Sequence, residues 1–116
     1  MKYILLFCGT PEDQAAFDAM SPEQLRQRYA EVGRWFMENK SKIGSSQQLQ
    51  GPHAATTVRF DAGGRPTIQD GPFMEGKEMV GGYCEIDVAD LDEALQIAGT
   101  WPGRGAVEIR PVVERR

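Results

Sequence analysis

Histidine and cysteine are scarce in this chain, whose 116 residues include one histidine and two cysteines. No CxxC pair or cluster of Cys and His occurs, so a zinc or iron site built from these ligands is not expected. The sequence also lacks a phosphate-binding glycine loop and a nucleophile motif. These absences argue against hydrolases, kinases and metalloenzymes, and we expect no bound metal and no cofactor.

Long apolar runs and an excess of basic residues are missing as well. The apolar run at 3–8 is far shorter than the roughly 18 residues that a membrane-spanning helix needs. It ends at Gly9-Thr10-Pro11 without a cleavage-site pattern, so it is not expected to be a signal peptide. The formal net charge is −4 and no basic face is concentrated. We therefore expect a cytoplasmic protein with neither a membrane nor a nucleic acid as its partner.

The first half of the chain predicts a central strand followed by a helix. Residues 2–8 are apolar on both alternating faces, which is typical of a strand in the middle of a sheet. Ser21-Pro22 with Gln24 forms a capping box that predicts a helix over 21–42, with Leu25, Tyr29, Val32 and Phe36 on its buried face. Residues 9–20 predict a loop or short irregular helix, and 45–54 an approach loop or a short edge strand.

The second half predicts a hairpin, a strand, a helix and a last strand. The hairpin pairs 55–61 with 66–69 around Ala62-Gly-Gly-Arg65, and a strand follows at 83–88. Asp90 and Glu93 predict the start of a helix whose buried face carries Leu91, Ala94, Leu95 and Ala98. The strand 106–113 is expected at an edge because Pro111 lacks an N–H. Cys8 and Cys84 fall in predicted strands and are expected to be reduced core residues.

Together these elements predict one α+β domain over 1–116, with a ferredoxin-like antiparallel sheet and two helices on one face. The other sheet face mixes charged, polar and apolar side chains, which suits neither a dry core nor full exposure. Its polar members are Arg59, Tyr83, Glu85, Asp87, Glu108 and Arg110.

The stretch 70–82 links the predicted hairpin to the strand that follows. Asp70-Gly-Pro72 has the chemistry of a turn, because Asp accepts a backbone N–H, Gly tolerates positive φ and Pro fixes its own φ. Phe73 and the charged residues Glu75, Lys77 and Glu78 come next. The stretch is either a solvated connection with Phe73 on the core or a loop that faces a ligand.

Five segments together resemble the DGPF branch of the YCII-related domains: Met1-Lys-Tyr-Ile-Leu-Leu6, Ala54-Ala-Thr-Thr-Val-Arg59, Asp70-Gly-Pro-Phe73 with Glu75 and Lys77-Glu78, Gly81-Gly-Tyr83, and Ile86-Asp-Val-Ala-Asp-Leu-Asp-Glu-Ala-Leu95. The resemblance covers nearly the whole chain. It implies a homodimeric α+β barrel, in which two sheets pack face to face and enclose a cleft for a small-molecule ligand. It also implies a bacterial family, some of whose members are similar to small-molecule enzymes that use a His and an Asp.

The candidate site combines the only histidine with residues around this loop. His53 and Asp70 are the candidate catalytic pair, in which the acid would orient the ring for proton abstraction. The candidate substrate-binding residues are Arg59, Phe73, Glu75, Lys77, Glu78 and Tyr83. The alternative is that His53 is an exposed loop residue, that Asp70 only caps a turn, and that the charges form ion pairs.

Three hypotheses on function follow from these residues. The first is a cofactor-independent lyase or isomerase that acts on a small polar or aromatic acid, with Arg59 holding an anionic group. The second is a metabolite-binding or regulatory module without catalysis. The third is a structural dimerisation domain.

Overall fold

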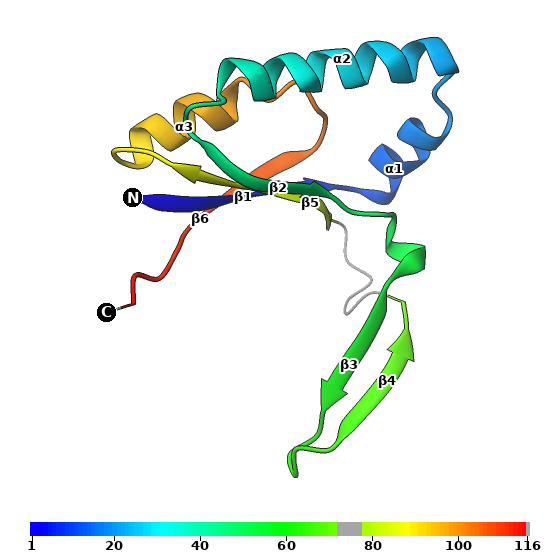
Figure 1. Ribbon diagram of the computed structural model, residues 1–116. Coiled ribbons are helices and arrows are strands. Elements are labelled where there is room, and N and C mark those ends of the chain that lie inside the picture. Colours follow the sequence, from blue (N-terminus) through cyan, green and yellow to red (C-terminus); the bar gives the residue numbers. More distant parts are fainter. Residues whose placement is uncertain (72–77, 116) are drawn as a thin grey trace.

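The computed structural model describes residues 1–71 and 78–115 as an antiparallel sheet, three helices and a projecting hairpin. The main sheet has the order β2-β5-β1-β6, formed by Ile43–Gln48, Met79–Asp87, Lys2–Gly9 and Ala106–Pro111. All three helices lie on one side of it (Figure 1). They are α1 (Pro11–Asp18), α2 (Pro22–Glu38) and α3 (Leu91–Gly99). A short 3-10 helix, η1 (Pro52–Ala54), follows β2.

The main sheet and the two helices α2 and α3 follow the βαββαβ order of a ferredoxin-like arrangement, in the sequence β1, α2, β2, β5, α3 and β6. The predicted composition of the sheet was wrong in one respect. The hairpin of β3 (Thr56–Phe60) and β4 (Pro66–Asp70) forms a separate two-stranded sheet, and β2 takes the edge position instead. The β2 segment Ile-Gly-Ser-Ser-Gln-Gln is short and polar, so its own sequence carries little strand signal.

The prediction of two helices was also incomplete, because α1 is a third one. Thr10 caps it, its side chain accepting the N–H of Asp13 while the Asp13 carboxylate accepts the N–H of Thr10. Pro11 stands in its first turn, where a missing N–H does no harm. The predicted capping box of α2 at Ser21 and Gln24 is confirmed, but this helix ends at Glu38 rather than near residue 42.

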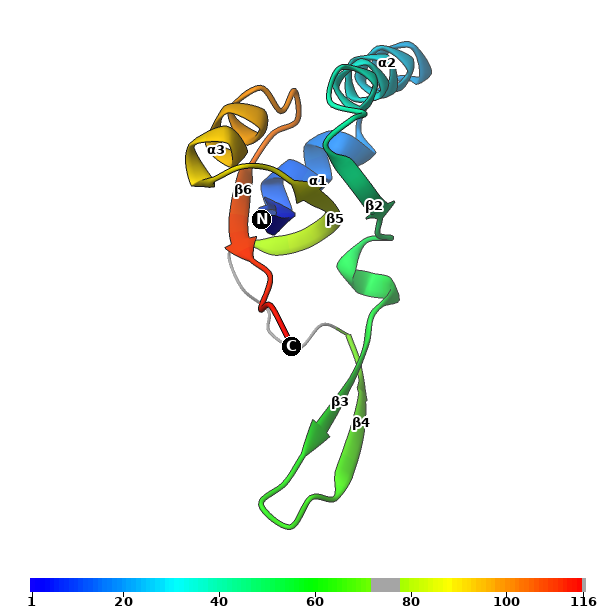
Figure 2. The ribbon, with the colours of Figure 1, turned by 60° about the vertical axis from the view of Figure 1, so that its left-hand side comes forward.

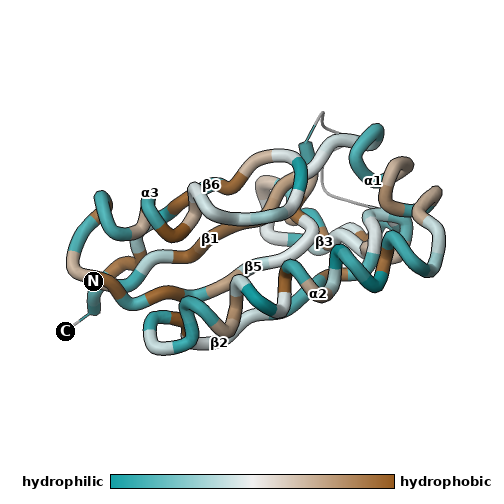
Figure 3. The backbone as a smooth tube through the Cα atoms, turned by 90° about the horizontal axis from the view of Figure 1, so that it is seen from above, coloured by the Kyte–Doolittle hydropathy of each residue, from teal (hydrophilic) through white to brown (hydrophobic). Residues whose placement is uncertain are grey.

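The core lies between the helices and the covered side of the sheet. Its buried side chains are Tyr3, Leu5, Trp35, Cys84, Ile86, Val88, Ala94 and Ile97. Figure 3 shows hydrophobic stretches along β1 and β6, and alternating hydrophilic and hydrophobic segments along α2. Trp35 is the buried residue of α2, whereas the predicted core residue Tyr29 is exposed. In α3 the buried residues are Ala94 and Ile97, and the predicted core residues Leu91 and Leu95 are exposed.

Aromatic rings fill the end of this core beside α3. Phe7 stacks on Trp101 with ring centroids 4.1 Å apart, and Trp35 meets Trp101 edge to face at 5.0 Å. The Trp35 indole N–H donates to Thr100 Oγ1 at 3.0 Å and to the Ile97 carbonyl oxygen at 3.3 Å. Trp35 therefore ties α2 to the end of α3.

The hairpin projects from the main sheet on the side opposite the helices, and we call residues 55–71 the arm (Figures 1 and 2). Asp61 orders its tip, since the Asp61 carboxylate accepts the N–H groups of Gly63 and Arg65, both at 2.9 Å. The arm gives the chain a radius of gyration of 16.3 Å. A compact chain of this length has a radius of about 13 Å. The arm therefore stands out from the domain.

Candidate functional site

We call the sheet side opposite the helices the open face, and no helix of the described residues lies over it (Figures 1 and 2). Because side chains alternate along a strand, burial of Tyr3, Leu5, Cys84 and Ile86 under the helices places their neighbours on this face. The strand register then sets two rows across the sheet. One row is Gln47, Tyr83, Leu6 and Glu108, and the other is Glu85, Ile4 and Arg110.

The open face is therefore apolar at its centre and polar on both sides. Ile4, Leu6 and Cys8 of the central strand are half-buried although no helix covers them. Around them, Lys2 Nζ lies 3.6 Å from Glu85 Oε1, and Arg110 Nε lies 3.8 Å from Glu108 Oε2. These ion pairs are long and partly exposed, so they contribute little to stability and leave the charged groups able to bind others.

Tyr83 stands in the middle of this arrangement, next to Leu6 on the neighbouring strand. Its ring is half-buried, and within the described part of the chain its hydroxyl forms no hydrogen bond. A phenol can both donate and accept a hydrogen bond, so this group is available to a ligand. Tyr83 is thus a sequence-predicted site residue that lies on the open face.

Cys8 also lies on the open face, and two acidic residues act on its thiol. Burial raises the pKa of the Cys8 thiol, the carboxylates of Glu108 and Glu78 raise it further, and the backbone N–H of Glu108 offsets part of the rise. Glu78, another predicted site residue, is exposed and close enough to act on Cys8. Cys84 is buried under the helices, and this burial raises its pKa to about 11. The two cysteines lie on opposite faces of the sheet, and both are free.

Asp70 and His53 lie at the base of the arm. Asp70 is the last residue of β4 and pairs with Thr56, while His53 lies in η1, and both are exposed. The base is closed by the Gly71 N–H, which donates to the Ala55 carbonyl oxygen at 2.8 Å. Among the residues that the structure describes, no hydrogen bond or ion pair joins the His53 and Asp70 side chains. The structure brings them to one end of the arm without placing them in contact.

Local geometry explains the turn at Asp70 and the position of the histidine ring. Gly71 has φ +104°, which side-chain-bearing residues rarely adopt, so the predicted role of this glycine is confirmed. The His53 ring packs on Gly51, where an added Cβ would lie 2.9 Å from Nδ1. The ring thus occupies the space that any other residue at 51 would need.

The remaining predicted residues are dispersed. Arg59 lies on the arm rather than on the main sheet, where the sequence pattern placed it, because β3 belongs to the separate hairpin. Phe73, Glu75 and Lys77 lie outside the described residues. Gln47 was missed as a candidate, since its polar segment was interpreted as an approach loop or a short edge strand without a defined neighbour. Its alignment beside Tyr83 follows from strand pairing, which the sequence alone does not reveal.

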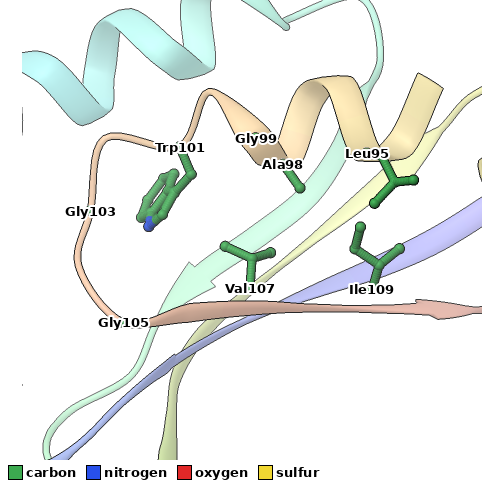
Figure 4. Close-up of a pocket in the computed structure, with 8 residues that line it drawn as sticks. All are labelled: Leu95, Ala98, Gly99, Trp101, Gly103, Gly105, Val107 and Ile109. Atoms are coloured by element: carbon green, nitrogen blue, oxygen red, sulfur yellow. The ribbon is translucent and has the colours of Figure 1, made fainter. Parts of the chain in front are cut away.

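An apolar hollow of about 340 Å³ lies on the helix side, between α3 and β6 (Figure 4). Val107 and Ile109 of β6 point into it beside Leu95, and Trp101 stands at one end. No charged side chain lines this hollow, whose residues are Leu95, Ala98, Gly99, Trp101, Gly103, Gly105, Val107 and Ile109. It is separate from the open face and offers no group for acid or base chemistry. The described residues also contain no group of metal-ligating side chains and no helix long and apolar enough to cross a membrane.

Comparison with known proteins extends this picture, since the model of the YCII-related domain matches residues 1–116. The chain belongs to the YCII-related domain family. A relative of this chain is an uncharacterised protein of Rhizobium meliloti (strain 1021), which is 34% identical, with 97% of this chain and 92% of that protein covered.

The YCII-related chain is also similar in fold to a solved structure, 5-chloro-2-hydroxyhydroquinone dehydrochlorinase (TftG) from Burkholderia phenoliruptrix AC1100 in complex with 2,5-dihydroxybenzoquinone. The TM-score is 0.54, with 99% of this chain and 96% of that chain covered and 14% sequence identity. At this identity the likeness concerns the fold, and it agrees with the α+β arrangement described above.

Proposed function

We propose that two copies of this chain pack through their open faces and that the cleft between them binds a small organic molecule. The observation that carries this proposal is the half-polar open face, on which Tyr83 lies next to Leu6 at the apolar centre. Ligand sites commonly combine apolar walls with a few polar groups that fix orientation. The open face supplies both, with Ile4 and Leu6 as apolar walls and Tyr83 as a polar group.

A second copy is the natural cover for this face because the described part of the chain provides none. An apolar strand face left in water loses the stabilisation of burial, about 25 cal/mol per Å². The polar side chains on both sides of Leu6 would lack hydrogen-bond partners in a fully dry interface. A cleft instead lets a ligand or water form hydrogen bonds with them. In this arrangement Phe73, Glu75, Lys77 and Glu78 contribute from the segment after Asp70. Arg59 lies on the other face of the arm from Val58, where it would hold an anionic group outside the cleft.

Binding can be tested with 2,5-dihydroxybenzoquinone, the compound bound to the fold neighbour, and with benzoate as a simple aromatic acid. We expect saturable binding in calorimetry and a rise in Tm. Tyr83→Phe removes only the hydroxyl and should weaken binding by about three- to tenfold. Tyr29→Phe makes the same change on the outer surface of α2 and serves as the control. If neither compound binds the wild-type protein, binding of this ligand class is refuted and a structural dimerisation domain becomes the better hypothesis.

A second candidate function is proton transfer by His53 and Asp70. It is favoured by their shared position at the base of the arm, where the chain segments that carry them are joined by the bond from Gly71 to Ala55. The fold neighbour is named as a dehydrochlorinase, and loss of hydrogen chloride begins with removal of a proton, the role proposed for His53.

Chloride release from 5-chloro-2-hydroxyhydroquinone would test this second function. We expect His53→Asn and Asp70→Asn to abolish release while leaving the affinity for 2,5-dihydroxybenzoquinone unchanged. Release by the wild-type protein at the rate of buffer alone would rule out this substrate, and undiminished release by His53→Asn would rule out the catalytic pair.

A further inference from the structure

The arm has one apolar face and one polar face. Val58 lies opposite Ile68, and Phe60 lies opposite Pro66, so these four side chains share a face. Val58, Phe60 and Ile68 are 48%, 70% and 72% exposed. The other face carries polar side chains, namely Thr57, Arg59, Thr67 and Gln69. This alternation is typical of a strand pair with one covered side.

Nothing in the described protomer covers the apolar face of the arm. β3 and β4 pair only with each other and make no extensive contact with another element of the described chain. An isolated two-stranded hairpin is only marginally stable in water. Its exposed apolar face therefore indicates a contact outside the protomer.

The direction and length of the arm indicate that a second copy provides this contact. The arm projects on the same side of the sheet as the open face (Figures 1 and 2). Two sheets packed face to face are about 10 Å apart. Each arm strand has five residues and so spans roughly 17 Å. An arm of this length extends past the plane of a partner sheet and must run alongside it.

The area of the open face also indicates that a second copy contacts the arm. Four strands about 4.8 Å apart and roughly 20 Å long present on the order of 400 Å² in projection, or about 800 Å² for two copies. Stable interfaces bury about 1,200 Å² or more, and a cleft that holds a ligand reduces the direct contact further. The arm is an apolar surface on the same side that can supply the difference.

We propose that the arm of each protomer packs its apolar face, formed by Val58, Phe60 and Ile68, against the second copy and closes one side of the shared cleft. This inference rests on the homodimer of the proposed function. By strand alternation Asp70 lies on the same face of the arm as Val58 and Ile68, so the arm also directs Asp70 toward the partner. Each site is then completed by both copies.

A photo-crosslinker in the arm tests this contact directly. Benzoylphenylalanine replaces Phe60 in one sample and Thr67, on the opposite face, in a matched sample. Each is mixed with a ¹⁵N-labelled copy, so that mass spectrometry separates crosslinks between copies from those within one chain. We expect crosslinks between copies from position 60 and few from position 67. Crosslinks only within one chain, or equal yields from both positions, would overturn the proposal.

A second measurement separates the arm contact from the dimer itself. The double variant Phe60→Thr, Ile68→Thr keeps β-forming residues and should raise the dimer Kd on the order of a hundredfold or more, because both arms change. Gln69→Thr on the polar face should leave it unchanged. If wild-type dimers form and the double variant does not weaken them, the arm proposal fails and the open-face dimer stands. If the wild-type chain stays monomeric, both fail.

Discussion

Replacing Leu6 by Asp should expose the Cys8 thiol by separating two copies of the chain. Leu6 lies at the centre of the open face, two residues from Cys8 on the same side of β1. If open faces pack together, the thiol of Cys8 is protected at high protein concentration. The variant should be monomeric at the same concentration, and its Cys8 should react freely.

The expected magnitude follows from the position of Leu6. It is half-buried in the protomer, so its further burial in a dimer is worth about 1 kcal/mol per copy. A carboxylate buried there without a partner costs about 3 kcal/mol or more, and Glu108 beside it adds repulsion. The sum is about 4 kcal/mol per copy and about 8 kcal/mol for two copies, which raises Kd on the order of a hundred-thousandfold.

The assay is the rate of alkylation by iodoacetamide, followed peptide by peptide so that Cys8 and Cys84 are distinguished. Cys84 should stay unreactive in every folded variant, because it is buried and its pKa is about 11. Cys8 should react at least about tenfold faster in Leu6→Asp than in the wild-type dimer. The added carboxylate raises the pKa of Cys8 and by itself slows alkylation, so faster alkylation reports exposure.

Leu95→Asp is the matched control, since Leu95 is exposed on α3 at the other side of the molecule. It should leave the rate at Cys8 unchanged. The reasoning is refuted if wild-type Cys8 reacts at the same rate as in Leu6→Asp and if dilution of the wild-type protein does not accelerate the reaction.

Two further predictions concern stability. The N–H and the hydroxyl of Thr10 lower the pKa of Asp13 below its ordinary 3.8, so the carboxylate stabilises the fold above that pH and the effect is lost as the pH falls through the lowered pKa. Asp13→Ala should therefore lower Tm at pH 7, by an amount that shrinks in acid; an undiminished difference at low pH would contradict this. In urea unfolding, Trp35→Phe should lower the free energy of unfolding by about 2 kcal/mol and Thr100→Val by about 1 kcal/mol. The double variant should show a coupling energy of about 1 kcal/mol between the two positions. Strict additivity would show that their 3.0 Å hydrogen bond contributes nothing.

Strong local signals predicted most elements of the fold. The apolar run in β1 and the capping residues Ser21 and Asp90 mark elements that the structure contains, although only one of the two bonds of a capping box is present at Asp90. The arm was predicted as a hairpin but not as a separate sheet. Pairing between distant strands decides this point. The polar β2 segment was predicted as a loop or a short edge strand, and nothing in its own sequence indicates that it pairs with β5.

The site was less predictable for a similar reason. The alternation of Tyr83 and Glu85 correctly indicated a half-polar sheet face, because period-two patterns report which side a residue takes. Arg59 follows the same alternation, but its strand belongs to the arm. Whether His53 and Asp70 act together depends on tertiary and quaternary contacts. The sequence pattern around each residue does not predict these contacts.

The insertion of the arm between β2 and β5 has a consequence for folding. These neighbouring strands are joined by the thirty residues from 49 to 78, where a turn of a few residues would suffice. Closing the longer loop costs about 2 kcal/mol more in chain entropy. The contacts of the arm within its own protomer do little to offset this, whereas contacts with a second copy would. Ordering of the arm and association of two chains would then be linked equilibria, with amide-exchange protection of β3 and β4 rising with protein concentration.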